Sequence, residues 1–412
     1  MNDMIETFLA IIRAALRRET PVLQPEPTEE QWKTLIDMAG MHNVLPLFYE
    51  AVYSLPSLAN SPALLAMMKR RVWQRVAMQA QCTGEFLKLN DQLLDAGIRP
   101  LVVKGIICRD LYPQPDHRPS SDEDVLIPPE AFAQCHRILT DRGMQTSQEN
   151  PSEAYEVPYR DPNSQLYIEL HKYLFPPQSE AYGDLNRFFE TVRERAVSVQ
   201  IQGHTVYTLD PTSHLFYLIC HAFKHFLHSG FGIRQVCDIV LYANAYGEAV
   251  DWEQILQQCR EIHGDKFAAA LFAIGRKYLV FDPVRACWPQ SWQDILVDER
   301  PMLEDLLAGG LYGGASMSRK HSSSITLEAV TARKQGKKRG NALLHSAFPS
   351  AEKLQQRYPY LQKHRFLLPL AWCSRLWTYR KETRNTADNN AADALKIGAE
   401  RVELMKLYGI VE

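Results

Sequence analysis

The 412-residue chain lacks the features that mark several classes of protein. Its net charge is only −2, so contact with nucleic acid or a membrane surface would need a local charged patch. The eight cysteines contain no CxxC pair, which favours free thiols in a reducing compartment over a disulfide framework or zinc site. No apolar run reaches the roughly eighteen residues of a membrane span, and no basic segment with a following apolar stretch opens the chain. We therefore expect a cytoplasmic protein without a membrane partner.

Helical periodicity is clear in both terminal parts of the chain. Residues 1–95 form the expected N-terminal helical region, with a capping box at Thr28 and Gln31 and a long helix ending before Gly97. Residues 211–412 form the expected C-terminal helical domain. Its predicted helices cover about 211–228, 234–246, 252–262, 266–278 and 391–408. The Gly/Ser-rich stretch 309–324 predicts a mobile loop.

Between these two regions, residues 96–210 are predicted to form a mixed α/β core. Short apolar runs at 99–104 and 123–127 predict buried strands. Segments 155–160 and 165–170 predict one hairpin, and segments 197–201 and 205–209 predict a second. The expected fold class is therefore α+β, with a small mixed or antiparallel sheet flanked by two helical regions.

The strongest chemical signal is the pair Asp122 and Asp124 at the start of the second strand. Alternate residues of a strand share a face, so both carboxylates point the same way. Two adjacent like charges need a cation, and Mg²⁺ suits a few carboxylates with phosphate oxygens and water. A DxD motif alone is weak evidence, because solvated acidic turns are common.

Two further motifs support a phosphate-handling site. Lys104 and Gly105 end the first strand, where a glycine lets backbone N–H groups approach phosphate closely. The alternating segment 167–171 puts Glu169 and His171 on one face, and Glu169 is the expected third carboxylate.

The order of motifs along the chain resembles the uncharacterised nucleotidyltransferase family of the polymerase β-like superfamily. The resemblance covers most of the chain beyond about residue 30. It rests on Lys104-Gly105, Leu111-Tyr112-Pro113, Arg118-Pro119, Asp122-Glu123-Asp124, Glu169-Leu170-His171, Asp210-Pro211, the helix His214 to His225, Arg234 to Asp238, Phe348-Pro349-Ser350, Tyr358-Pro359 and Leu367-Leu368-Pro369.

The resemblance implies a metal-dependent transfer of a nucleoside monophosphate from an NTP, with ATP the first choice, to an acceptor hydroxyl, releasing pyrophosphate. Two Mg²⁺ ions would be held by Asp122, Asp124 and Glu169. The acceptor is an unidentified small molecule or protein. The residues expected to bind the nucleotide are Lys104, Gly105, Arg118, His171, His221 and His225.

The chain departs from the family pattern in three places. Ser121 and Glu123 stand where the family usually has glycine and an apolar residue, and Glu169 stands where the superfamily typically has aspartate. Glu123 faces away from the metals into an expected core, so it needs a Lys or Arg partner there. These departures motivate an alternative in which the chain is a degenerate, non-catalytic binder of a nucleotide or a protein.

Four histidines fall on one face of the helix expected at 211–228, namely His214, His221, His225 and His228. They could form a metal site or a wall of the active cleft. Alternatively they meet solvent or neighbouring carboxylates, which we favour for His214 and His228.

A third hypothesis is addition of nucleotides to an RNA end. Its support is the basic run at 333–339. The near-neutral net charge argues against a nucleic-acid partner, since binders of the phosphate backbone usually carry an evident basic face.

Overall fold

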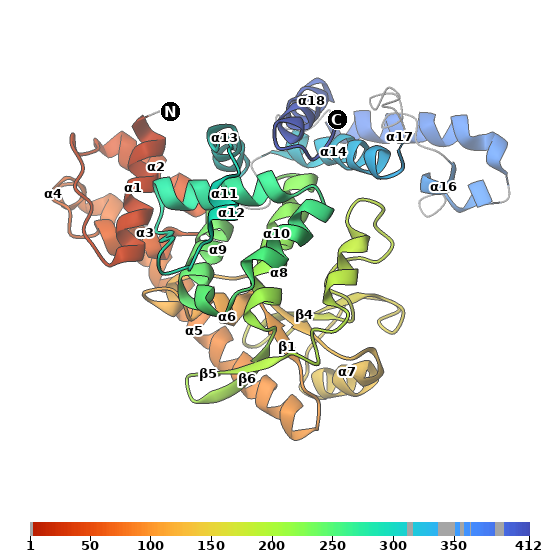
Figure 1. The fold of residues 1–412 in the computed structure, drawn as a ribbon, viewed down its shortest axis with the longest axis horizontal. Helices are drawn as coiled ribbons and strands as arrows, with labels where there is room; N and C mark the ends of the chain where they lie inside the picture. Colours follow the sequence, from red (N-terminus) through yellow and green to blue (C-terminus); the bar gives the residue numbers. More distant parts are fainter. Residues whose placement is uncertain (1–2, 311–315, 337–350, 355–357, 363, 384–390) are drawn as a thin grey trace. The chain divides into compact units, whose positions relative to one another are not determined.

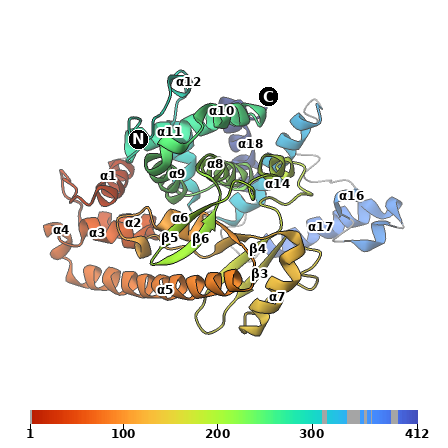
Figure 2. The ribbon, with the colours of Figure 1, turned by 60° about the horizontal axis from the view of Figure 1, so that its bottom comes forward.

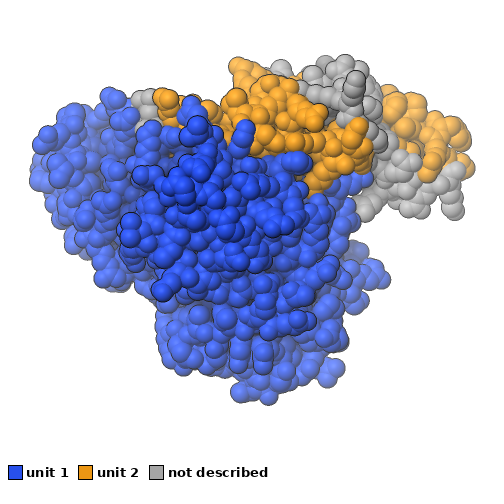
Figure 3. Space-filling view, viewed as in Figure 1, with its two compact units in different colours: residues 1–221, 233–299 blue, residues 222–232, 300–412 orange. Residues whose placement is uncertain are grey.

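The computed structural model describes residues 3–310, 316–336, 351–354, 358–362, 364–383 and 391–412. The chain forms two compact units, coloured separately in Figure 3. The first comprises residues 1–221 and 233–299, and the second comprises residues 222–232 and 300–412. The predicted boundary at residue 210 does not coincide with either limit, and the three-region division remains a prediction.

The first unit opens with a helical bundle whose long last helix runs beneath the sheet (Figure 2). Thr28 and Gln31 form the predicted capping box at the start of the second helix, so this prediction is confirmed. Gly97 ends the long helix with φ 78°, a conformation that glycine adopts without strain. The helices are α1 Asp3–Arg17, α2 Glu29–Met41, α3 Leu45–Val52, α4 Pro56–Ala59 and α5 Pro62–Asp95.

A four-stranded sheet follows in the order β1-β2-β4-β3. Strand β1 pairs antiparallel with β2, β2 pairs parallel with β4, and β3 and β4 form the predicted hairpin. The sheet is therefore mixed, and the predicted α+β class is confirmed. The edge strand β1 and its neighbour β2 are buried along their whole length. The bounds are β1 Leu101–Val103, β2 Glu123–Leu126, β3 Glu156–Arg160 and β4 Tyr167–His171.

The second predicted hairpin is also present and forms a separate two-stranded sheet. It consists of β5 Val197–Ile201 and β6 His204–Thr208, with Gly203 at φ 86° in the turn. Two helices connect the strands of the main sheet, α6 Gly105–Arg109 and α7 Phe132–Asp141.

Four helices predicted by periodicity lie on the side of the sheet opposite α5 (Figures 1 and 2). They are α8 Pro211–His228, α9 Ile233–Tyr246, α10 Trp252–Glu261 and α11 Asp265–Tyr278. A short α12, Gln290–Gln293, follows them. Helix α9 is buried over most of its length, including the charged Arg234 and Asp238. The sheet is thus covered on both faces, which places polar side chains at its strand ends in a buried setting.

The second unit is helical in the part that the structure describes. Its helices are α13 Arg300–Gly309, α14 Met317–Lys334, α16 Ala351–Leu354, α17 Leu368–Thr383 and α18 Ala391–Leu407. The prediction of a loop over 309–324 is wrong from residue 317 onward, because Ser316 caps α14 and apolar Ile325 and Val330 are buried along it. Residues 311–315, the basic residues 337–339 and Phe348-Pro349-Ser350 lie outside the described residues.

Short 3₁₀ helices complete the described structure, at Pro115–His117, Pro129–Ala131, Gly183–Phe189, Gly247–Ala249, Pro359–Gln362 and Arg365–Leu367. None of the helices in the described ranges is long and apolar enough to cross a membrane.

Candidate active site

The parallel pairing of β2 and β4 brings three predicted site residues together. Asp124 lies directly opposite Glu169 in this register, and His171 follows two residues along β4 on the same face. One ligand atom from each of Asp124, Glu169 and His171 lies within 4.8 Å of the others. In the described part of the chain no other group of three acidic, histidine or cysteine side chains meets this test.

Asp122 is not part of this cluster, although it lies nearby. It precedes β2, and its Oδ2 is 3.6 Å from Nζ of Lys104. The same Nζ is 2.6 Å from Oδ2 of Asp124 and 3.4 Å from Nε2 of His221. The ammonium group therefore lies between the two aspartates of the DxD motif, and its side chain is only 6% exposed.

The backbone turns sharply at Lys104, between β1 and α6. This residue has φ 60° and ψ −112°, a conformation that an L-residue adopts only at a cost of about 1–3 kcal/mol. The Lys104 N–H donates to Nε2 of the fully buried His214, 3.1 Å away. The strained turn is thus held in place by the helix that packs over it.

The tautomer of His214 follows from its partners. Nε2 accepts from a backbone N–H, so the proton is on Nδ1, which lies 3.1 Å from Oγ1 of Thr208. The Thr208 hydroxyl in turn donates to the carbonyl oxygen of Val102, at 2.6 Å. Burial lowers the pKa of His214 to about 3, which keeps the ring neutral. The prediction that His214 meets solvent or a carboxylate is therefore wrong. Its hydrogen bond to Lys104 could not be predicted, because no sequence pattern pairs residues 110 positions apart.

In the absence of a metal, two basic side chains pair with the carboxylates of the cluster. Burial opposes ionisation of Asp124, but Lys104 and His171 lower the pKa of this carboxyl well below its usual range. Burial alone would lower the pKa of His171, yet hydrogen bonds to Asp124 and Glu169 and nearby carboxylates raise it to about 9. Burial raises the pKa of Glu169, and so does the charge on Asp124. Both oxygens of Asp124 therefore face a cation within 3.1 Å.

Glu123 has the partner that its burial required. Its carboxylate pairs with Arg109 of α6, whose side chain is 1% exposed, and it accepts from the Ile106 N–H at 2.7 Å. A Cβ on Gly105 would lie 1.9 Å from Oε2 of Glu123. The need for glycine here thus comes from the Glu123 carboxylate, and the expectation that Gly105 serves phosphate binding remains a prediction.

Arg118 pairs with a buried carboxylate of α9. Its Nε and Nη2 donate to the two oxygens of Asp238 in α9, at 2.7 and 2.6 Å, and Nη1 donates to the carbonyl of Gly105 at 3.3 Å. Tyr112 also donates to Asp238, at 2.8 Å. All the guanidinium's donating nitrogens have partners and the side chain is 1% exposed, so the structure does not support its predicted contact with a triphosphate.

The remaining histidines of α8 divide between the two units. His221 contacts the Lys104 ammonium in the first unit and is buried. His225 and His228 belong to the second unit, and the role expected for His225 remains a prediction.

The donor set fits a divalent cation. Two carboxylates and an imidazole converge within 4.8 Å, and Asp124 and Glu169 supply the oxygen ligands that Mg²⁺ and Mn²⁺ prefer. Asp124, Glu169 and His171 would therefore hold the ion. Because only a neutral imidazole binds a metal, the ion would displace the proton of His171. Asp122 lies on the other side of the Lys104 ammonium.

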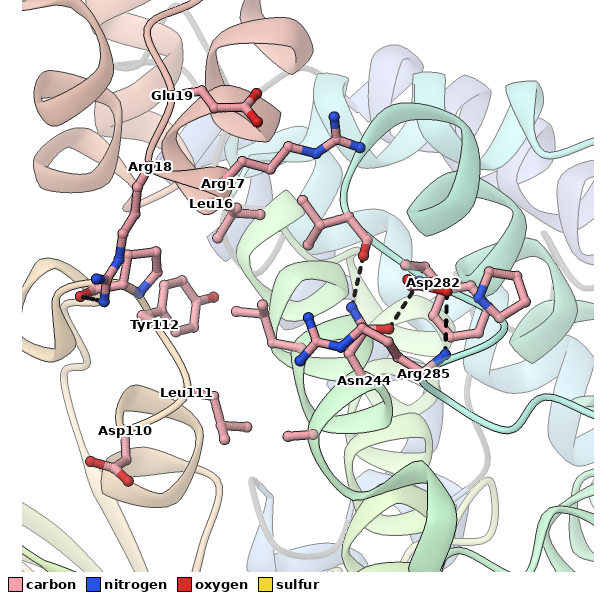
Figure 4. A pocket seen from close by; sticks show the side chains of 16 residues that line it. Leu16, Arg17, Arg18, Glu19, Asp110, Leu111, Tyr112, Asn244, Asp282 and Arg285 are labelled. Atoms are coloured by element: carbon pink, nitrogen blue, oxygen red, sulfur yellow. Dashed lines mark hydrogen bonds between the residues drawn. The ribbon is translucent and has the colours of Figure 1, made fainter.

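A separate cavity of about 810 Å³ lies at the far end of α6 (Figure 4). It contains none of the predicted site residues, although the wall residue Tyr112 touches the Asp238–Arg118 pair. Its charged lining is balanced, with Arg17, Arg18 and Arg285 set against Glu19, Asp110 and Asp282. The lining therefore has no net charge that would select one class of ion.

Comparison with known proteins gives one family and one solved structure. The model of a family described as uncharacterised nucleotidyltransferase matches residues 28–279. The chain is also similar, with 14% identity and a TM-score of 0.29, to an antigenic nucleotidyltransferase-like protein from Paracoccidioides brasiliensis. That match covers 50% of this chain and 96% of the other. No curated protein matches the chain.

Proposed function

The chain belongs to the uncharacterised nucleotidyltransferase family, and from this premise we propose that it transfers a nucleoside monophosphate from an NTP to a hydroxyl group. ATP is the first candidate donor and Mg²⁺ the first candidate metal. The observation that carries the proposal is the register of β2 and β4, which sets Asp124 opposite Glu169 with His171 in reach of both.

The proposed reaction is an in-line displacement at phosphorus. The acceptor oxygen forms a bond to the α-phosphorus while the bond from that phosphorus to the bridging oxygen of the β-phosphate breaks, and pyrophosphate leaves. Glu169, whose side chain is 24% exposed, is the carboxylate of the cluster that the acceptor can reach, and we propose that its oxygen not bound to the ion takes the hydroxyl proton. A divalent ion held by these residues would supply positive charge that offsets the charge developing on the phosphate oxygens. Lys104 holds Asp124 ionised and oriented.

The proposed acceptor is a small molecule or a protein with a free hydroxyl group. This choice fits the near-neutral charge of the chain, which does not favour nucleic acid. The expected cytoplasmic location likewise remains a prediction.

Calorimetry with each of the four NTPs, with and without Mg²⁺, tests the proposal. We expect one NTP to bind in the micromolar range only with Mg²⁺, and Asp124→Asn to lose that binding. The matched control is Asp37→Asn, which changes an exposed aspartate of α2 in the same chemical way and should bind as the wild type does. Binding that ignores both Mg²⁺ and the Asp124 variant would refute the metal-dependent mechanism.

The alternative is a non-catalytic member that binds a nucleotide or a protein. The observation that favours it is that Lys104 and His171 already contact both oxygens of Asp124. It predicts weak or Mg²⁺-independent nucleotide binding and no pyrophosphate release with any acceptor. Glu123, which first motivated this alternative, has a structural partner in Arg109.

A further inference from the structure

The position of Lys104 bears on how many metal ions the site can hold. In a two-metal site the ions lie about 3.5–4 Å apart and share carboxylates between them. Here the pair that would share them, Asp122 and Asp124, has the Lys104 ammonium between its carboxylates, at 3.6 and 2.6 Å. A metal bound to both aspartates would need the space that Nζ fills, because Mg²⁺ lies about 2.0–2.1 Å from its oxygen ligands.

Lys104 is held in this position at both ends. Its backbone N–H is bound by His214, and His214 is fixed by Thr208. Its ammonium contacts Asp124 and His221, and the side chain is buried. A lysine that merely balances charge on a surface would be exposed and mobile. The strained φ of 60° at this residue indicates that the fold maintains the position against a local energetic cost.

The three metal-ligand candidates lie on the other side of Asp124. Oδ1 of Asp124 faces His171, 3.1 Å away, whereas Oδ2 faces Lys104. Glu169 joins the Oδ1 side, with Oε2 at 3.6 Å from His171 Nε2. The carboxylate of Asp124 thus separates a side with three potential ligands from a side filled by an ammonium group.

We propose that the site holds a single divalent cation on Asp124, Glu169 and His171, and that the ammonium of Lys104 takes the place of a second ion. This inference rests on the proposed function, since it concerns the metal of the same site. Asp122 then serves to hold Lys104 and is not a metal ligand.

The test counts bound Mn²⁺, a paramagnetic probe, in the full chain with a non-hydrolysable NTP analogue. Calorimetry gives the stoichiometry after correction for Mn²⁺ bound to free analogue. Electron paramagnetic resonance reports whether two Mn²⁺ ions are magnetically coupled at short distance. For the wild type we expect one site-bound ion and no coupled pair.

Two substitutions of Lys104 separate its charge from its volume. Lys104→Gly empties the position and suits the positive φ, so we expect a second, coupled Mn²⁺. Lys104→Met keeps most of the volume without the charge, so we expect one ion bound about tenfold more tightly or better. Lys88→Met, on an exposed lysine of α5, is the matched control and should leave both stoichiometry and affinity unchanged.

The outcomes distinguish this inference from the proposed function. A coupled Mn²⁺ pair in the wild type overturns the single-ion site and leaves the proposed function standing. No bound ion in the wild type overturns both. If Lys104→Met binds Mn²⁺ more weakly than the wild type while its circular dichroism is unchanged, then Lys104 helps to hold the bound ion. That result would contradict the inference that Lys104 takes the place of a second ion.

Discussion

Replacement of Glu123 tests the buried ion pair that joins β2 to α6. The carboxylate is 4% exposed, pairs with a guanidinium that is 1% exposed, and caps the Ile106 N–H. In Glu123→Gln the amide oxygen can still accept from Ile106, but Arg109 is left as a buried charge. Breaking a buried ion pair in this way costs about 3–5 kcal/mol. The remaining bonds of Arg109 to Thr83 and Ser120 place the expected loss near the lower limit, about 3 kcal/mol.

The assay is urea unfolding followed by tryptophan fluorescence. Five of the seven tryptophans lie in the first compact unit, so its transition dominates the signal. Glu85→Gln is the control, because its carboxylate is 26% exposed and its ion pairs with Lys88 and Arg142 should contribute less than about 1 kcal/mol. The double variant Arg109→Met, Glu123→Gln should be less destabilised than Glu123→Gln alone, since no unpaired charge remains.

The result that would refute this reasoning is a loss for Glu123→Gln no larger than that for Glu85→Gln. Such a result would mean that water or a local shift compensates Arg109. The departure from an apolar residue at position 123 would then be of no structural consequence.

Two further predictions concern the same region. The pKa of His171 is raised from 6.5 to about 9, so protonated His171 adds about 3 kcal/mol to the free energy of unfolding. This stabilisation is complete below pH 6.5 and is lost as pH rises through 9. Urea unfolding of the metal-free protein at several pH values should show the decline, and His171→Gln should remove most of the pH dependence. Gly105→Ala should destabilise by about 1–3 kcal/mol in the same assay, because its Cβ would displace the Glu123 carboxylate. Gly84→Ala, where a Cβ meets nothing within 4 Å, should instead be neutral or stabilising.

Local elements of the fold could be predicted because their signals are local. The capping box at Thr28 and Gln31 and the turn at 161–164 are set by residues within one turn of each other. The strand order could not be predicted, since hydrophobic runs do not say which neighbour each strand takes. The parallel pairing of β2 with β4 skips a strand in the chain, and this pairing is what places Asp124 opposite Glu169.

In the candidate site, too, local features could be predicted from the sequence and long-range partners could not. Sequence periodicity correctly puts Glu169 and His171 on one face, and it requires a basic partner for Glu123 without identifying Arg109. Arg118 resembles a phosphate ligand by its place in the motif, but its guanidinium pairs with Asp238, which lies 120 residues away along the chain. Partners at such separations are fixed by packing of whole elements, and single residue types do not encode them.

The burial of Arg118 against Asp238 has a practical consequence for recombinant fragments. An excised fragment that stopped at residue 210 would contain the whole sheet but would lack α8 and α9. Its Lys104 turn would lose His214, Arg118 would lose its partner Asp238, and the apolar face of the sheet that these helices cover would be exposed to water. Expression of an isolated core should therefore include residues up to 299, the limit of the first unit, so that the helical segment remains with the sheet it completes.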